Sequence, residues 1–259
     1  MKFYKYRSFQ GQSRQFTNDI VVNSNLYFAK PNEFNDPFEF QVNIVTSATR
    51  DQFTKYLEVC GFNEMPMLSK MNDKQFNEYI APLLNGRDAL GWHSVINKLK
   101  NKYGILCLSD SCLNINMWSQ YGDCHRGVCF EFESLDEDDI FFHAKKIEYL
   151  KDPPKVEIVK EYINEHGRKE LARKFVYSKY ETAWDHEKEW RVLTNVPGVT
   201  SFPKACLKAI YLGSEYKLSD PFTDLVKEHR PDIDIVLLKK GDAYFLDEKW
   251  RTKPELVIY

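Results

Sequence analysis

Two compact apolar runs, at residues 104–109 and 127–132, restrict the fold of this chain more than any other feature of its sequence. Short apolar runs of this kind are typical of strands buried in a β-sheet. Other strand-like runs lie at residues 3–7, 25–29, 190–194, 209–212 and 233–238. We therefore expect residues 3–7, 105–109, 128–132 and 188–193 to be strands of a single sheet.

The sequence between residues 50 and 103 has a different pattern, because apolar residues such as Phe53 and Leu57 recur there at helical spacing. Residues 155–179 fit one or two amphipathic helices broken near Gly167. Together these patterns predict an α+β fold with a mixed or antiparallel β-sheet core. A helical insertion at about residues 50–103 is expected to pack outside that sheet.

Length and composition indicate a folded protein. The 259 residues contain no repeat and no Gly/Ser linker, so we expect a single domain over residues 1–259. Hydrophobic residues make up 43% and charged residues 29%, which argues against disorder. The net charge of −2 argues against a protein that coats DNA, although a local basic groove stays open. No apolar segment has the length of a membrane span or of a signal peptide core, so we expect a cytoplasmic protein that does not bind membranes.

The cysteines raise the question of a metal site. Two Cys-x4-Cys pairs begin at Cys107 and Cys124, and His125 stands beside the second. Cys107 and Cys129, however, lie in the apolar runs, where a small buried hydrophobic residue is expected. The x4 spacing also differs from that of a tight zinc knuckle. We therefore expect reduced thiols and no metal bound by the cysteines.

The segment 187–191, Glu-Lys-Glu-Trp-Arg, is the most informative for function. In an extended strand Glu187, Glu189 and Arg191 would share one face. Two neighbouring carboxylates repel each other unless a cation or a ligand holds them, and such an arrangement is common in functional sites. The alternative is a solvated edge strand with alternating charges.

A turn-rich segment at residues 32–39 is a second candidate. Pro37 fixes one backbone dihedral, so a rigid loop that presents Asp36 and Glu39 is plausible. The alternative is a turn whose Asn and Asp side chains bond only their own backbone.

The segment 117–121 supplies two aromatic rings, Trp118 and Tyr121, and His125 follows it. These rings would suit the stacking of a planar ligand. A Met-Trp pair is, however, more often part of a hydrophobic core.

Taken together, these segments resemble a bacterial family, the domain-of-unknown-function 2971 family. The motifs that carry the resemblance are Tyr4-Lys5-Tyr6-Arg7, the loop at residues 34–39, Cys107-Leu108-Ser109, the segment 117–121, Gly127-Val128-Cys129 and the segment 184–191. They span nearly the whole chain. Gln120 departs from the pattern, because histidine is common at that position in the family.

A more remote resemblance gives an activity. An early strand Arg, a middle strand Ser and a late Glu-x-Glu are similar to the Arg-Ser-Glu pattern of ADP-ribosyltransferases, and Arg7, Ser109 and Glu187/Glu189 match it in order. The resemblance implies an ADP-ribosyltransferase-like sheet and NAD as substrate. Arg7 would hold a phosphate or ribose of NAD, and Ser109 would organise the pocket. Glu189 would stabilise the oxocarbenium-like transition state, while Glu187 would orient or deprotonate the acceptor.

The same resemblance implies a cleft that binds NAD. Its expected lining residues are Tyr6, Arg7, Phe38, Ser109, Trp118, Tyr121 and Arg191. We further expect Arg7 and Glu189 to approach each other across this cleft, because either charge would be costly to bury without a partner.

The sequence is compatible with several functions. The chain is expected to be an ADP-ribosyltransferase or an NAD glycohydrolase if it is an enzyme, with a protein or a nucleic acid as acceptor, and the family resemblance suggests a phage-defence or toxin effector. A second possibility is a metal-dependent hydrolase or nuclease that binds Mg²⁺ through Asp36, Glu39, Glu187 and Glu189. A third is a non-catalytic module of a bacterial defence system that binds a nucleotide or a protein partner.

Overall fold

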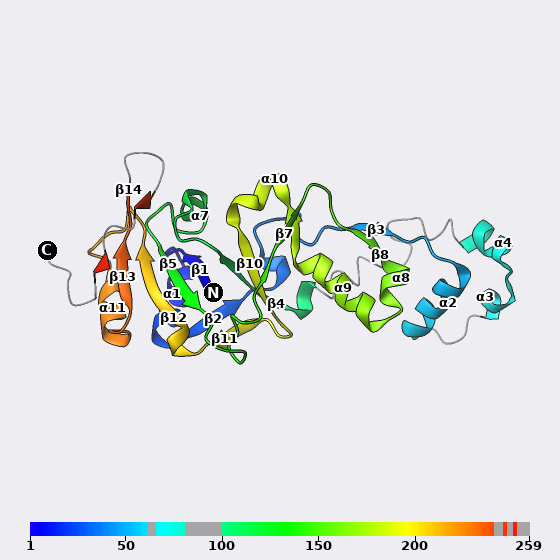
Figure 1. Ribbon diagram of the computed structural model, residues 1–259, viewed down its shortest axis with the longest axis horizontal. Coiled ribbons are helices and arrows are strands. Elements are labelled where there is room, and N and C mark those ends of the chain that lie inside the picture. Colours follow the sequence, from blue (N-terminus) through cyan, green and yellow to red (C-terminus); the bar gives the residue numbers. More distant parts are fainter. Residues whose placement is uncertain (62–65, 81–99, 241–245, 248–250, 253–259) are drawn as a thin grey trace. The chain divides into compact units, whose positions relative to one another are not determined.

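The computed structural model describes residues 1–259 except for residues 62–65, 81–99, 241–245, 248–250 and 253–259 (Figure 1). The chain divides into two compact units. The first comprises residues 1–33, 102–147 and 183–259, and the second comprises residues 34–101 and 148–182. The single domain expected over residues 1–259 stays a prediction.

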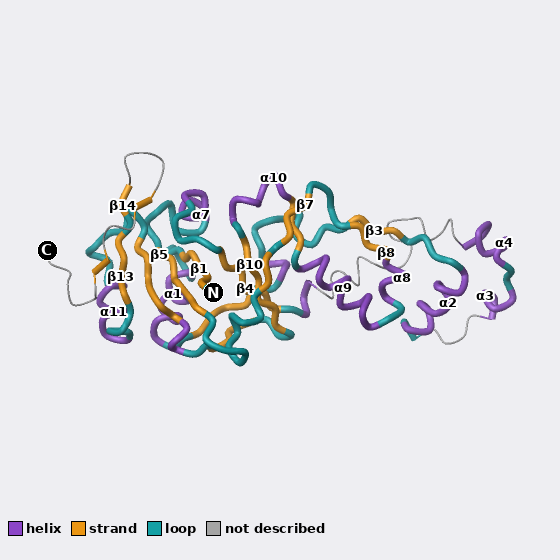
Figure 2. The backbone as a smooth tube through the Cα atoms, in the orientation of Figure 1, coloured by secondary structure: helices purple, strands orange, loops and turns teal. Residues whose placement is uncertain are grey.

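An eight-stranded sheet forms the centre of the first unit (Figure 2). Its strands, in spatial order, are β16 (Arg251–Thr252), β13 (Asp234–Leu237), β12 (Leu207–Leu212), β5 (Val128–Glu133), β1 (Lys2–Arg7), β4 (Gly104–Ser109), β10 (Glu189–Thr194) and β6 (Lys145–Lys146). All neighbouring strands are antiparallel except β12 and β13, which are parallel. The four segments expected to share one sheet do so as β1, β4, β5 and β10. The mixed, mostly antiparallel α+β fold is therefore confirmed.

Smaller elements complete the first unit. The helices are α1 (Ser13–Val22), α7 (Ile115–Gln120) and α11 (Phe222–His229), with short helical turns η1 (Pro31–Glu33), η3 (Asp185–Glu187) and η4 (Lys204–Cys206). Two further two-stranded sheets pair β2 (Asn25–Phe28) with β11 (Gly198–Ser201), and β14 (Lys239–Lys240) with β15 (Leu246–Asp247). Helix α10 (Glu181–Trp184) lies where the chain passes from the second unit to the first.

The alternation of side chains along the strands separates two faces of the central sheet. On one face Phe130, Ile210 and Val192 join the largest apolar cluster, to which Val21 of α1 and Phe222 of α11 also belong. A second, smaller cluster combines Tyr6, Cys129 and Tyr211 with Trp118 of α7. The second face also carries the charged residues Glu131, Glu189 and Arg191.

Asp139 fixes the loop that follows β5. Its buried carboxylate accepts hydrogen bonds from the hydroxyl of Ser134 and from the backbone N–H groups of Leu135, Asp136, Phe141 and Phe142. Burial raises the pKa of Asp139, but these hydrogen bonds outweigh it and hold the pKa below the ordinary value.

We expect Asp139→Ala to lower the free energy of unfolding by about 2–3 kcal/mol at neutral pH, because several buried N–H groups lose their acceptor. The folded-state pKa is depressed, so this stabilisation is present above the unfolded pKa of about 4 and is lost as the pH falls through the folded-state value. Urea unfolding at neutral and acidic pH measures both effects. The matched control is Asp138→Ala, whose exposed carboxylate lies one residue away; equal losses in the two variants would contradict the prediction.

The second unit is mainly helical in the part that the structure describes. Its helices are α2 (Arg50–Val59), α3 (Pro66–Lys70), α4 (Asp73–Gln75), α8 (Ile158–Tyr162) and α9 (Glu165–Val176), with a π-helical turn η2 (Phe76–Ile80). Short parallel pairs join β3 (Asn43–Val45) to β8 (Lys155–Glu157) and β7 (Glu148–Leu150) to β9 (Ser178–Tyr180). Residues 81–99 of the expected helical insertion lie outside the described residues, and its packing outside the sheet stays a prediction.

The break in the helical stretch 155–179 lies before the expected Gly167. Helix α9 begins after Asn164, whose side chain accepts a hydrogen bond from the backbone N–H of Gly167. A side chain that accepts from this position is an N-cap, so Asn164, rather than the glycine, defines the boundary.

Among the described helices, none combines the length and the apolar character that a membrane-spanning segment requires. All six cysteines are free thiols, and Cys107 and Cys129 lie in strands β4 and β5 as expected.

Candidate functional site

A row of side chains crosses the second face of the sheet. Tyr4 of β1 lies opposite Ser109 of β4, and Ser109 in turn lies opposite Glu189 of β10. Residues opposite each other on neighbouring antiparallel strands point to the same face and are close enough to interact. The structure therefore brings together two of the predicted site residues, Ser109 and Glu189, on adjacent strands.

Glu189 is held by Arg191 within the same strand. The Nε of Arg191 donates to Oε1 of Glu189 at 2.7 Å, and Nη2 donates to Oε2 at 3.1 Å. Both side chains are buried, with 4% of Glu189 and 0% of Arg191 exposed. A two-pronged, charge-assisted contact of this kind fixes the orientation of the carboxylate. Arg191 thus acts on Glu189, and the expected role in contacting NAD stays a prediction.

The thiol of Cys107 belongs to the same neighbourhood. Cys107 of β4 lies opposite Arg191 and forms a hydrogen bond with the side chain of Glu189. Burial raises the pKa of Cys107 well above the ordinary value for a thiol, and the charge of Glu189 raises it further. A thiol with a raised pKa stays protonated, so Cys107 is not an activated nucleophile.

Glu187 does not belong to the strand, which corrects the expected alternation. It ends the helical turn η3, and Lys188 after it adopts a left-handed backbone with φ of 47°. Strand β10 therefore begins only at Glu189. The helical turn and the left-handed residue interrupt the extended backbone before Glu189, so the period of two does not apply to the two glutamates.

Glu187 is nevertheless fixed by residues of the predicted site. The hydroxyl of Tyr121 donates to Oε1 of Glu187 at 2.7 Å, and only 3% of the Glu187 side chain is exposed. The hydroxyl of Ser109 donates to the backbone carbonyl of Glu187, also at 2.7 Å. Ser109 and Tyr121 thus hold the turn that leads into β10, and Asn114 adds a hydrogen bond from its side-chain amide to the carbonyl of His186.

Tyr6 and Trp118 are core residues rather than exposed stacking surfaces. Trp118 is fully buried, and its indole Nε1 donates to the carbonyl of Cys112 at 2.7 Å. Tyr6 packs edge-on against Trp118, with 5.1 Å between ring centroids, and its hydroxyl donates to the carbonyl of Ser111. Burial raises the pKa of Tyr6 far above its ordinary value. Their expected contact with a ligand ring is therefore not supported by their positions.

Arg7 does not pair with Glu189, contrary to expectation. In the described part of the chain Arg7 forms no ion pair; its Nε is buried without a hydrogen-bond acceptor, and its guanidinium lies 5.9 Å from the ring centre of Phe16. Burial lowers the pKa of Arg7. Glu189 pairs instead with Arg191, two residues along the same strand. This pairing explains why an ion pair between Glu189 and Arg7 is not needed.

Lys5 interacts electrostatically with Arg7 and with both glutamates. The sequence analysis did not include it among the candidate site residues. Its ammonium donates to the carbonyl of Cys107 at 2.8 Å and interacts electrostatically with Arg7, Glu187 and Glu189. Burial lowers the pKa of Lys5, and the two glutamates oppose that shift. The sequence contained a signal for Lys5, because it stands between Tyr4 and Tyr6 in a predicted strand, and lysine is rarely buried.

Glu131 of β5 is a second residue that the sequence analysis missed. Its carboxylate accepts hydrogen bonds from the hydroxyls of Tyr4 at 3.2 Å and Tyr211 at 2.8 Å, and it pairs with the ammonium of Lys2 at 2.8 Å. Burial, followed in importance by interactions with Glu131, raises the pKa values of both tyrosines. A glutamate within the apolar run of a buried strand was the signal that could have identified it.

The loop at residues 34–39 belongs to the second unit. Phe38 exposes 66% of its side chain there, and Asp36 accepts a hydrogen bond from the Phe38 backbone N–H at 2.8 Å. This is the local turn bond that the alternative interpretation expected. Glu39 is buried and lies 3.9 Å from the ammonium of Lys179. Across the residues described, no group of three or more His, Cys, Asp and Glu side chains has an arrangement that could hold a metal ion.

Comparison with known proteins gives one result. Residues 117–192 match the family model described as "Protein of unknown function (DUF2971)". The matched segment contains Trp118, Tyr121, Glu187, Glu189 and Arg191. It supports the resemblance to the 2971 family that the motifs indicate. No curated protein and no solved structure matches the chain.

Proposed function

We propose that this protein is an NAD-dependent ADP-ribosyltransferase-like enzyme whose catalytic carboxylate is Glu189. In this reaction the bond between the nicotinamide nitrogen and the ribose C1′ breaks, and nicotinamide leaves with the bonding electrons. An acceptor, or water in an NAD glycohydrolase, then attacks C1′ and gives up its proton. Glu189 stabilises the positive charge that develops on the ribose, and Glu187 accepts the proton of the acceptor.

The observation that carries this proposal is the register of β4 and β10, which sets Ser109 directly opposite Glu189. Ser109 holds the backbone at Glu187, so it organises both glutamates. Arg7 forms no ion pair with any described residue, and the proposal assigns its guanidinium, which lies beside Phe16 of α1, to a phosphate of NAD. Lys5 lies near both Arg7 and the glutamates and adds positive charge.

The burial of the site sets a condition on this function. Glu187 and Glu189 are almost completely buried, so NAD has to displace the groups that cover them. Displacing them costs free energy, and weak binding of NAD is the expected consequence.

The test measures NAD binding by calorimetry and nicotinamide release by chromatography on the purified chain. We expect Glu189→Gln to reduce nicotinamide release by about 100-fold or more, as for the loss of one group that stabilises a transition state, with NAD affinity changed only a few-fold. Arg7→Gln is expected to weaken NAD binding by about tenfold, because a charge-assisted contact to phosphate is lost. Circular dichroism first establishes that each variant is folded.

Arg173→Gln is the matched control, because it removes an exposed arginine from α9 in the second unit. It should leave binding and release unchanged. If the wild-type chain neither binds NAD nor releases nicotinamide, the proposed reaction is wrong.

A second candidate is a non-catalytic module that binds a nucleotide or a protein partner. The observation that favours it is that Glu189 and Glu187 are already bound within the chain, by Arg191 and Tyr121. NAD binding without nicotinamide release, unchanged by Glu189→Gln, would favour this module over the enzyme. A role as a phage-defence or toxin effector, and the choice between a protein and a nucleic acid as acceptor, stay predictions.

A further inference from the structure

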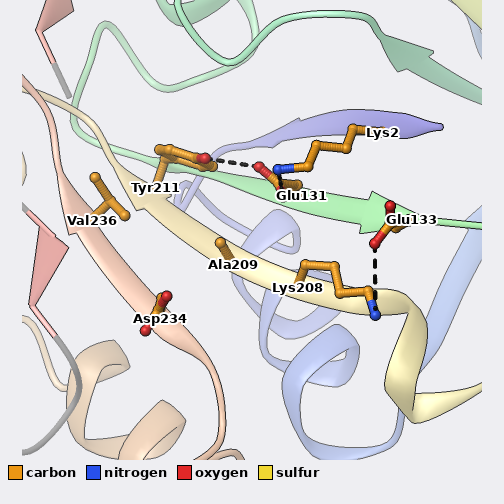
Figure 3. Close-up of a pocket in the computed structure, with 8 residues that line it drawn as sticks. All are labelled: Lys2, Glu131, Glu133, Lys208, Ala209, Tyr211, Asp234 and Val236. Atoms are coloured by element: carbon orange, nitrogen blue, oxygen red, sulfur yellow. Dashed lines mark hydrogen bonds and ion pairs between the residues drawn. The ribbon is translucent and has the colours of Figure 1, made fainter.

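The second face of the sheet contains a polar cavity of about 270 Å³, whose lining does not include Glu189. Figure 3 shows the residues that line it. Its lining comes from four neighbouring strands, β1, β5, β12 and β13. The charged and hydroxyl groups among the lining residues are Lys2, Glu131, Glu133, Lys208, Tyr211 and Asp234. All of them belong to the first unit.

The charges in this cavity do not balance. Lys2 pairs with Glu131, and Lys208 pairs with Glu133 at 3.8 Å. Asp234 of β13 has neither a hydrogen bond nor an ion pair with its side chain among the residues that the structure describes. The unmatched charge is therefore negative.

The local backbone contributes to this arrangement. The register between β12 and β5 shifts between Leu207 and Ala209, so Lys208 occupies an irregular position in the strand. Such a bulge redirects a side chain, and Lys208 lines the same cavity as Ala209 despite being its neighbour in sequence. The bulge thus brings Lys208 into the cavity, where it pairs with Glu133. Asp234 is the carboxylate that is left to pair with a ligand.

Glu131 makes the base of the cavity a hydrogen-bond acceptor. The hydroxyls of Tyr4 and Tyr211 both donate their protons to its Oε2. Each hydroxyl then has only lone pairs left to offer a further group. A ligand that donates hydrogen bonds suits this surface, whereas an anion would face the three carboxylates.

We propose that this cavity is a second binding site, which takes a small organic cation with a protonated amine or a guanidinium group. Asp234 is its counter-ion, and Glu131 with the hydroxyl of Tyr211 accepts hydrogen bonds from its N–H groups. The volume lies just below the range of about 300–1,000 Å³ typical of sites for drug-sized ligands, so the ligand is a small one.

The site is separate from the one proposed for NAD. Asp234, Ala209, Glu131, Tyr4, Ser109 and Glu189 lie in successive register positions across six strands. With about 4.8 Å between neighbouring strands, Glu131 lies roughly 14 Å from Glu189 along this row. The cation site therefore goes beyond the proposed function and does not depend on it.

The test uses isothermal titration calorimetry on the whole chain with putrescine and agmatine as probes. The matched non-cationic compounds are 1,4-butanediol and succinate, which have the same four-carbon skeleton as putrescine. We expect at least one cation to bind and neither of the other two compounds to do so. Asp234→Asn should weaken binding of that cation on the order of tenfold, because it removes one charge and keeps the shape. Lys208→Met should strengthen it, because a competing cation is removed.

Asp224→Asn is the control, since it neutralises an exposed aspartate on α11 outside the cavity. It should leave the affinity unchanged. Failure of both cations to bind, or an affinity that Asp234→Asn does not lower relative to Asp224→Asn, would overturn the proposal. Repeating the titration with Glu189→Gln separates the two sites, because cation binding should persist there whatever happens to NAD.

Discussion

Replacing Arg191 with methionine is expected to lower the free energy of unfolding by about 3–5 kcal/mol. Arg191 is completely buried and contacts both carboxylate oxygens of Glu189. Its removal leaves Glu189 as a buried charge without this partner, and desolvation of such a charge is far more costly than the loss of packing. Urea unfolding followed by circular dichroism measures the change.

A double-mutant cycle separates the pair from the packing around it. The combination of Arg191→Met with Glu189→Gln should recover much of the stability lost in Arg191→Met, because no charge is then left unpaired. Arg173→Met is the control, since its partnership with Glu170 is exposed and is worth less than about 1 kcal/mol. A loss in Arg191→Met no greater than in Arg173→Met would show that the pair does not stabilise the fold.

This pair also explains why the expected contact between Arg7 and Glu189 was wrong. The desolvation argument correctly required a cation for the buried carboxylate. It did not decide between a cation across the sheet and one two residues away on the same strand face. Arg191 satisfies Glu189 with two contacts and without a long-range approach, so Arg7 keeps its charge unpaired among the residues described.

The strands were predictable from the sequence because their apolar character is local. Residues 104–109 and 128–133 are strands β4 and β5 almost as their apolar runs indicate. The turn at Lys188 was not predictable in this way. A left-handed lysine has no strong local signature, and the charged segment 187–191 was interpreted as one continuous strand.

The division into two units was also hidden in the sequence. The second unit combines residues 34–101 with 148–182. The helical pattern that ends near residue 103 lies close to one of these boundaries, but no linker marks any of them, and the pairing of the two segments rests on long-range contacts. Glu131, by contrast, was predictable in principle, since burying a glutamate within an apolar strand requires partners such as the Tyr4 and Tyr211 hydroxyls.

Trp118→Ala is expected to cost about 3–5 kcal/mol of unfolding free energy, as for other fully buried large aromatic residues. Trp118 fixes helix α7 to the sheet through its contact with Tyr6 and its hydrogen bond to the carbonyl of Cys112. The space around it is closely filled, because an added Cβ at Gly122 would lie 2.5 Å from its ring. Truncation therefore leaves a cavity that the neighbouring backbone cannot easily fill.

Trp118→Phe tests how this anchor affects the glutamates. Phenylalanine keeps much of the packing but removes the hydrogen bond from the indole N–H to the Cys112 carbonyl, at an expected cost of about 1–3 kcal/mol. Helix α7 is followed directly by Tyr121, whose hydroxyl holds Glu187, so loosening α7 should also weaken that contact. Hydrogen exchange at the backbone N–H groups of residues 118–122 should then be faster than in the wild-type chain. Leu135→Ala, an exposed control, should change neither stability nor exchange measurably. Equal exchange rates in Trp118→Phe and the wild-type chain would mean that Trp118 stabilises the core without positioning Tyr121.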